Sequence, residues 1–213
     1  MLDGLVAGAR EDAARRRQSR SLSDVEAAAV AAPPALDARA ALQRGERIKV
    51  IAEVKRASPS RGALAEIPDP ADLARSYAAG GAAAVSVLTE ERRFGGSLDD
   101  LSAVRAAVDI PVLRKDFIAE PYQVLEARAA GADLVLLIVA ALDDATLAHL
   151  HALVLELGMT PLVETHDAEE VHRAVALGAS VIGVNARDLS TFELDRDLFG
   201  RLAPSIPDGT VRI

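Results

Sequence analysis

Glu53 and Lys55 lie two residues apart in the stretch IAEVKRASPS, an apolar run that breaks off at Ser-Pro-Ser. Residues two apart in a β-strand point to the same face, so this carboxylate and amine would lie side by side. Such a pair can hold and transfer protons near neutral pH. Charges facing a layer of helices would be buried away from water, so we expect both side chains to face the interior of a barrel.

Lysine is a rare residue in this chain. Of the 24 basic residues, only Lys49, Lys55 and Lys115 are lysines. A lysine supplies a compact amine whose pKa can be lowered and which can donate a proton, whereas arginine cannot. A single lysine in such an arginine-rich chain could have survived by chance. Lys55 and Lys115, however, both fall at the ends of apolar runs and are candidate acids.

Polar side chains end three further runs in the same way. By the period of two, Lys115 and Phe117 would face inward on the third strand, Glu164 on the fifth, and Asn185 and Arg187 on the sixth. Each follows the apolar part of its run, where parallel barrels carry their active sites. Two carboxylates, two amines, an amide and a guanidinium in one pocket would suit acid and base steps.

Other polar residues receive a structural interpretation. Arg114 and Asp116 have the opposite parity, so we expect them to pair in the helix layer. The cluster Arg15–Arg17 is typical of a solvated helix end. The histidines offer no metal pair, because His149 and His151 would face different ways on a helix and the other two, His166 and His172, lack ligand partners. We therefore expect no metal site at these histidines.

Strands and helices alternate after Gly45. The strand candidates are 47–55, 83–89, 111–117, 134–140, 161–165 and 181–186, with 211–213 beginning another. The helices between them begin at the candidate N-caps Asp69, Ser97, Asp143 and Asp167. Repeated strand–helix units imply a parallel sheet with right-handed crossovers.

A weak internal repeat favours a barrel over an open sheet. Gly81, Gly131 and Gly178 each join a helix end to a buried strand, at a spacing that fits paired units of a barrel. A doubly wound sheet would need a glycine fingerprint after the first strand, and none is present. We expect a single α/β domain of TIM (β/α)8 type, with residues 1–45 as an N-terminal helical extension and 46–213 as the barrel.

The amino-acid composition excludes several classes of binding partner and site. The formal net charge of −8 and the pI near 5.1 argue against a general nucleic-acid binder. With no cysteine the chain has no disulfide framework or zinc-thiolate site. The N-terminal stretch reads as an amphipathic charged helix, not as a signal peptide, and no apolar run reaches membrane length. We expect a cytoplasmic protein that does not bind membranes.

Six blocks of the sequence carry a resemblance to a known family. They are VIAEVKRASPSRG, LTEERRFGGS, IPVLRKDF, ADLVLLIVAAL, PLVETH and IGVNARDL. In this order and spacing the chain resembles indole-3-glycerol phosphate synthase from about Leu2 to Ile213, and the E-x-K-x-x-S-P element is itself a strong signature. The resemblance implies a lyase of tryptophan biosynthesis that closes an indole ring with loss of carbon dioxide and water, and that uses no metal and no organic cofactor.

The resemblance also implies roles for the inward-facing residues. Lys115 would be the general acid at the substrate ketone, and Lys55 would contact the substrate carboxylate and share the acid role in dehydration. Glu164 would be the general base. Glu53 and Asn185 would orient the lysines and the sugar hydroxyls. Which lysine protonates which oxygen is left open by the sequence.

Binding residues follow from the same matching. An apolar cradle, which favours decarboxylation, would come from Pro59, Phe94, Phe117, Leu136 and Leu189; core packing is the alternative for its phenylalanines. The substrate phosphate would lie near Ser58, Pro59 and Ser60 in the loop after the first strand, with Arg187 as a second contact. The phosphorylated substrate is the expected partner, with other tryptophan-pathway enzymes as candidates. Arg61 and Gly62 would extend this loop into a lid.

The match departs from the family at its end. A complete barrel needs eight strand–helix units, and we expect about six and a half here, without the last two units and the Glu-Ser-Gly and Gly-Ser elements of the family. Two alternatives to an active synthase follow. One is an aldolase that forms a Schiff base through Lys55 or Lys115; the other is a non-catalytic fragment that keeps the fold.

Overall fold

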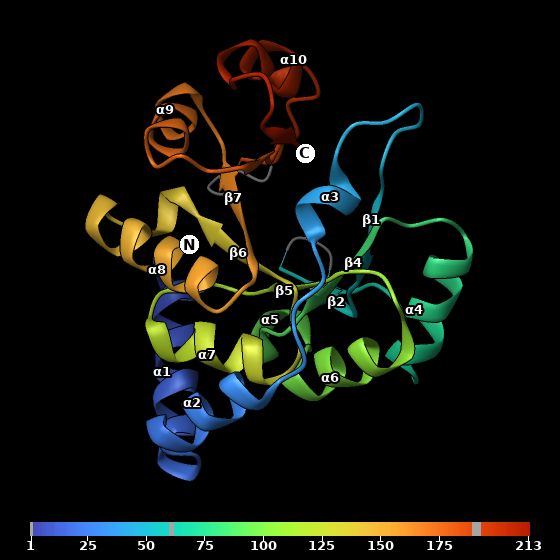
Figure 1. Ribbon diagram of the computed structural model, residues 1–213, viewed down its shortest axis with the longest axis vertical. Helices are drawn as coiled ribbons and strands as arrows, with labels where there is room; N and C mark the ends of the chain where they lie inside the picture. The colour runs from blue at the N-terminus through green and yellow to red at the C-terminus, as the bar shows by residue number, and fades with distance from the viewer. Residues whose placement is uncertain (1, 60–61, 189–192) are drawn as a thin grey trace.

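A computed structural model describes residues 2–59, 62–188 and 193–213 of the chain. The described residues form one curled sheet of parallel strands in the order β1-β4-β5-β6-β7-β8-β9 (Figure 1). The strands are β1 (Ile51–Val54), β4 (Ala84–Leu88), β5 (Val112–Lys115), β6 (Leu134–Ile138), β7 (Thr160–Thr165), β8 (Val181–Val184) and β9 (Val211–Arg212). A short antiparallel hairpin of β2 (Ala57–Ser58) and β3 (Gly62–Ala63) follows β1.

The sheet confirms the expected fold class, an incomplete TIM barrel. Each strand pairs in parallel with the next strand of that order, and within the described residues β1 and β9 have one neighbour each. The seven strands therefore curl without closing. The first expected strand was too long, because residues 47–50 precede β1 as irregular, exposed chain and Ile48 is 93% exposed. The expected strand 134–140 also ends early, at a turn of 3₁₀ helix over Val139–Ala141.

Helices follow the strands and cover the outside of the sheet (Figure 1). They are α4 (Pro70–Ala79), α5 (Glu91–Phe94), α6 (Leu98–Ala107), α7 (Pro121–Ala129), α8 (Asp144–Glu156), α9 (Ala168–Ala176) and α10 (Leu198–Leu202), with a 3₁₀ turn at Ala203–Ser205. All four expected N-caps are confirmed, since the side chains of Asp69, Ser97, Asp143 and Asp167 each accept a backbone N–H of the first turn.

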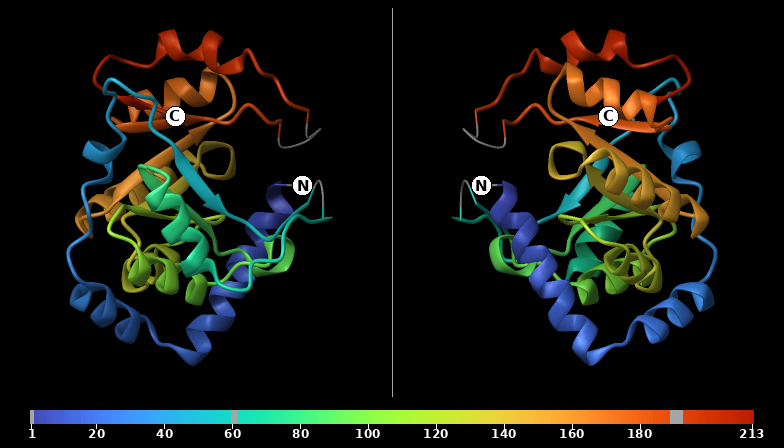
Figure 2. Two further views of the ribbon diagram at one scale, coloured as in Figure 1. Left: turned by 90° about the vertical axis from the view of Figure 1, so that its right-hand side faces the viewer. Right: turned by 90° about the vertical axis from the view of Figure 1, so that its left-hand side faces the viewer.

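Three helices precede the sheet. They are α1 (Leu2–Ser19), α2 (Leu22–Ala31) and α3 (Ala38–Leu42). In Figure 2, α1 and α2 form a V below the sheet, and α2 packs along α7. Ala38 and Leu42 of α3 join the apolar cluster inside the curled sheet. The N-terminal residues thus contribute to both the helix layer and the interior.

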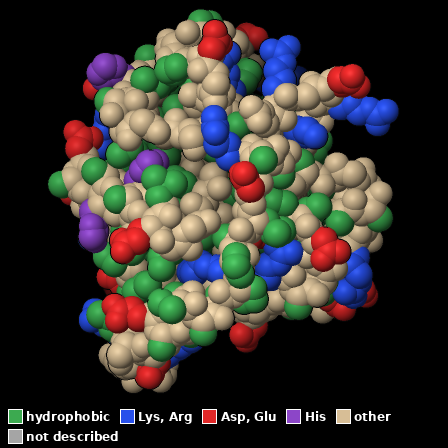
Figure 3. Space-filling model, in the orientation of Figure 1, with side chains coloured by type: hydrophobic (Ala, Val, Ile, Leu, Met, Phe, Trp, Pro, Cys, Tyr) green, Lys and Arg blue, Asp and Glu red, His purple; other side chains and the backbone are tan. Residues whose placement is uncertain are grey.

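The strands divide their side chains between two cores, as a period of two requires. Val135 and Leu137 of β6 pack against the helices, while Leu134, Leu136 and Ile138 of the same strand pack inside the curl. This alternation decides which polar residues meet at the strand ends. On the face drawn in Figure 3, acidic and basic side chains are interspersed.

Candidate active site

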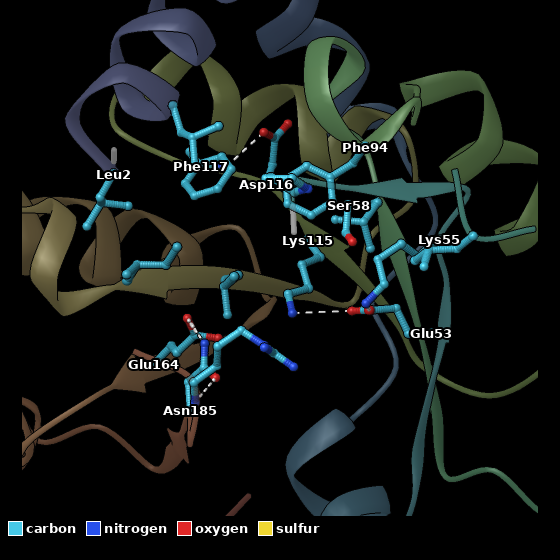
Figure 4. Close-up of a pocket in the computed structure, with 17 residues that line it drawn as sticks. Leu2, Glu53, Lys55, Ser58, Phe94, Lys115, Asp116, Phe117, Glu164 and Asn185 are labelled. Carbon is cyan, nitrogen blue, oxygen red and sulfur yellow. Dashed lines mark hydrogen bonds and ion pairs between the residues drawn. The ribbon is translucent and has the colours of Figure 1, made fainter. Parts of the chain in front are cut away.

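A cavity of about 470 Å³ opens at the carboxyl ends of the parallel strands (Figure 4). Eleven of the twelve residues that the sequence assigned to a site line it. They are Glu53, Lys55, Ser58, Pro59, Phe94, Lys115, Phe117, Leu136, Glu164, Asn185 and Arg187. The twelfth, Leu189, lies outside the described residues, as do Ser60 and Arg61 of the expected phosphate loop. The structure therefore brings residues from four different strand ends into one space.

Glu53 joins the two lysines of the cavity. Its Oε2 lies 3.2 Å from Lys115 Nζ, and its Oε1 accepts a hydrogen bond from Lys55 Nζ. Ser86, which lies opposite Glu53 in β4, also reaches Oε2, at 3.5 Å. Figure 4 shows both amines directed toward this carboxylate from β1 and β5. One carboxylate thus fixes two ammonium groups within one cavity.

The electrostatics of this cluster favour its charged form. Burial would raise the pKa of Glu53, but Lys115 and Lys55 outweigh it and hold that pKa below its ordinary value. Burial would likewise lower the pKa of Lys115, yet Glu164 and Glu53 raise it. Lys115 therefore presents an ammonium group, which is a proton donor, at neutral pH.

Glu164 stands across the cavity, at the end of β7, with its side chain 12% exposed. Asn185, just after β8, donates a hydrogen bond of 3.3 Å to Glu164 Oε1. Burial raises the pKa of Glu164, whereas His166, Lys115 and Asn185 together lower it below its ordinary value. The carboxylate is therefore ionised and able to accept a proton at neutral pH.

Apolar side chains form another wall. The rings of Phe94 and Phe117 lie 6.2 Å apart, centroid to centroid, at an angle of 44°. Leu136 adds an aliphatic surface from the strand between β5 and β7. A planar aromatic ligand would find apolar contacts here and charged groups opposite. Ser58 and Pro59 border the same cavity from the hairpin.

The comparisons with known proteins point to one family. The model of the family "Indole-3-glycerol phosphate synthase" matches residues 2–213. The chain belongs to this family. The protein of that name from Leifsonia xyli is 69% identical over all 213 residues, which cover 82% of its length. The one from Nocardioides is 63% identical at the same coverage, and the one from Mycobacteroides abscessus is 62% identical with 78% covered.

A solved structure supports the fold alone. The N-acetylmannosamine-6-phosphate 2-epimerase from Clostridium perfringens superposes with a TM-score of 0.55 at 13% identity, covering 78% of this chain and 79% of that one. At this identity the likeness carries no function.

A second charge cluster lies on the opposite face of β5, away from the cavity. Arg114 is fully buried, and its guanidinium donates to Asp116 Oδ2 at 2.9 Å, to Thr89 Oγ1 at 3.1 Å and to the carbonyl of Gln123 at 2.7 Å. The expected pair in the helix layer is thereby confirmed. Asp116 also reaches the cavity wall.

Sequence reasoning missed several groups of this family member. Leu2 and Leu5 of α1 line the cavity, although the sequence predicted only a general N-terminal helical extension. His166, which was considered only as a metal ligand and set aside, lies 3.4 Å from Glu164 and 3.0 Å from Glu170. Its position two residues after Glu164 on the same run was the available signal.

Another correction concerns Arg16, which was expected to be solvated. It makes two hydrogen bonds, of 2.6 and 2.8 Å, to the buried Glu126 of α7. A sequence cannot reveal that a helix 110 residues away carries the matching carboxylate. Among the described residues, no three His, Asp or Glu side chains form a group that could hold a metal ion. The described helices include none long and apolar enough to cross a membrane.

Proposed function

We propose that this chain converts 1-(2-carboxyphenylamino)-1-deoxyribulose 5-phosphate to indole-3-glycerol phosphate, with loss of carbon dioxide and water. Family membership supports the reaction. The observation that carries the assignment of residues is the cluster of Lys55, Lys115 and Glu53 facing Glu164 across one cavity. This arrangement offers an acid and a base on opposite sides of a bound substrate.

Lys115 acts first in the proposed sequence. The ring carbon that bears the carboxylate attacks the substrate ketone, and the ketone oxygen takes a proton from the Lys115 ammonium. The raised pKa of Lys115 keeps that proton available at neutral pH. Glu53, at 3.2 Å, holds the amine in place and stabilises its charge.

Lys55 serves the carboxylate in this scheme. Its ammonium pairs with the substrate carboxylate until the carbon–carbon bond breaks and carbon dioxide leaves, which restores the aromatic ring. The apolar wall of Phe94, Phe117 and Leu136 excludes water from this step and favours loss of the charged group.

Glu164 completes the reaction as the base. Dehydration expels the hydroxyl formed at the former ketone carbon and removes a proton from the neighbouring carbon, which the Glu164 carboxylate accepts. The departing hydroxyl takes a proton from one of the lysines and leaves as water. Asn185 keeps Glu164 oriented through its hydrogen bond of 3.3 Å.

The substrate phosphate belongs, in this proposal, between the hairpin and the end of β8. Ser58 supplies a hydroxyl and Arg187 a guanidinium at the same cavity. Ser60 and Leu189 keep their sequence-based roles as predictions, because they lie outside the described residues.

The test is direct formation of the fluorescent indole product. The purified chain is incubated with the substrate, and indole fluorescence and released carbon dioxide are measured together. We expect the two to appear in a ratio of one to one. Release of neither, from protein that melts cooperatively, would refute the proposal.

The Schiff-base aldolase is disfavoured by the electrostatics of the cavity. A nucleophilic lysine needs a neutral amine, and burial without a partner would provide one. Lys115 instead has a raised pKa and an ion pair with Glu53. Borohydride treatment in the presence of substrate should therefore leave the mass of the protein unchanged.

We further infer the setting of the enzyme. Its substrate and product are charged phosphate esters, which do not cross membranes unaided, and this supports a cytoplasmic location. The enzymes that supply the substrate and consume the indole product are the proposed partners, which co-purification would test. We also propose that residues 1–213 form one domain, in which α1–α3 are an extension of the barrel.

A further inference from the structure

His166 lies between two carboxylates at the rim of the cavity. Its Nδ1 is 3.0 Å from Glu170 Oε2, and the same oxygen accepts the backbone N–H of His166 at 2.8 Å. Its Nε2 is 3.4 Å from Glu164 Oε1. The side chain is 12% exposed, and Nε2 is buried without a well-aligned hydrogen bond. Glu170 therefore binds the Nδ1 side of the ring, and this contact directs Nε2 toward Glu164.

The local structure explains why Glu170 holds the His166 ring in one orientation. Glu170 belongs to the first turn of α9, whose N-cap is Asp167, and the backbone N–H of Glu170 donates to Asp167 Oδ1 at 2.8 Å. The helix start thus fixes Glu170, and Glu170 fixes both the backbone and the ring of His166. Little freedom is left for the imidazole to turn away from Glu164.

The charge of the ring follows from its neighbours. Burial alone would lower the pKa of His166, but contact with Glu164 and Glu170 raises it to about 9. An imidazolium donates from both nitrogens, so it can serve both carboxylates at neutral pH. The charged and titratable groups that line the cavities around this cluster are Asp3, Glu53, Lys55, Lys115, Asp116, Asp167, Arg187, Asp188 and Asp195.

We propose that His166 is a positioning residue for the base of the reaction: held by Glu170, it approaches Glu164 Oε1 and orients this carboxylate. The inference rests on the proposed function, in which Glu164 accepts a proton. Asn185 and His166 both approach Oε1, so among the described residues Oε2 has no hydrogen-bond partner and is left for the substrate. Glu164 Oε1 thereby holds the carboxylate in place, and Glu164 Oε2 is the oxygen that would accept the substrate proton.

The pH dependence of turnover gives the first test. An imidazolium lowers the pKa of Glu164, so in His166→Gln that pKa rises and more of the base is protonated in mild acid. We expect the acidic limb of the kcat profile to move up by about one pH unit, and kcat at neutral pH to fall by about tenfold with KM nearly unchanged. His172→Gln, an exposed histidine of α9, is the matched control and should behave as the wild type.

A second variant guards against simple misfolding. Glu170→Gln keeps His166 but removes one of its carboxylates, so the same limb should move in the same direction by a smaller amount. NMR titration of the His166 ring reads the interaction without substrate, and should give a pKa near 9 in the wild type and a lower one in Glu170→Gln.

The outcomes separate the two proposals. An inactive wild-type enzyme would overturn the proposed function, whatever the NMR titration gives. An active enzyme whose acidic limb is the same in His166→Gln and in the wild type, or whose His166 titrates near 6.5, would overturn the positioning role alone.

Discussion

The strand β5 carries charge on both of its faces, and the two faces differ in what surrounds them. Inside, Lys115 is one-third exposed and pairs with Glu53 at the edge of the cavity. Outside, Arg114 has no exposed side-chain surface and contacts Asp116 and Glu126 in the helix layer. Successive residues of one strand thus have different roles, because the period of two places them on opposite faces of the sheet.

The difference lies in how many partners each cation has. Arg114 donates to four neighbours from a planar guanidinium that stays charged, which suits a permanent structural link. Lys115 has one carboxylate in contact and open cavity beyond it, and its amine can give up a proton. The interior cation should therefore control rate, and the outer cation should control stability.

Removing the interior cation should give the largest effect. Lys115→Ala loses the acid and leaves Glu53 with one lysine, so we expect kcat to fall by about 10³-fold, with a small change in melting temperature. Lys115→Arg keeps the charge but not the transferable proton, and should be nearly as slow. Lys49→Ala, on exposed chain before β1, is the control in the fluorescence assay. Near-normal kcat in Lys115→Ala would break the comparison.

Removing the outer cation should act on folding. Arg114→Leu leaves Asp116 buried and charged without its cation and weakens the pairing of Glu126, which should cost about 3–5 kcal/mol of unfolding free energy. Urea titration measures this cost, and kcat per folded molecule should stay within about twofold. Arg75→Leu, which breaks an exposed pair on α4, should change stability by less than about 1 kcal/mol. Equal costs for the two would contradict the contrast.

Lowering the pH should show how much the interior carboxylate Glu53 contributes to stability. Its pKa lies below the ordinary 4.5, so its pairing with the lysines stabilises the fold above that pH and is lost as pH falls through the folded-state pKa. Glu53→Gln has no proton to take up, so its melting temperature should fall less steeply than that of the wild type between about pH 5 and 3. Glu156→Gln, at the exposed end of α8, provides the reference slope. Parallel curves for all three proteins would remove the stabilising role.

The apolar wall should show the smallest effect. Phe94→Leu keeps a hydrophobic side chain but loses the tilted contact with Phe117, worth about 1 kcal/mol. We expect KM to rise by about threefold to tenfold, with kcat reduced less. Phe199→Leu on α10 is the control, since that ring is 40% exposed and does not line the cavity. An unchanged KM would place the wall outside the binding site.

Periodicity explains why so much of this arrangement was predictable. A strand offers two faces, so the parity of Glu53, Lys115 and Glu164 predicted one shared space, and the opposite parity of Arg114 predicted the helix layer. The helix starts were predictable for a similar reason, because a cap depends on a side chain and a backbone N–H only two or three residues apart. Local rules were enough wherever the partner was local.

Long-range partners were not predictable in the same way. Nothing near Arg16 in the sequence indicates Glu126, and the ion pair depends on how α1 crosses α7. The environment of His166 depends on the angle at which α9 leaves β7, which turns Glu170 back toward the ring. The ends of β1 were misjudged because the apolar residues Ile48 and Val50 extend the sequence pattern into exposed chain.

The helix α1 extends from the cavity to the outer charge cluster. Its first turns place Leu2 and Leu5 on the cavity, while Arg16 near its end binds Glu126, which also contacts Arg114. An α-helix of 18 residues is a stiff rod about 27 Å long. One rigid element therefore supplies part of the cavity wall at its start and an ion pair of the outer cluster near its end.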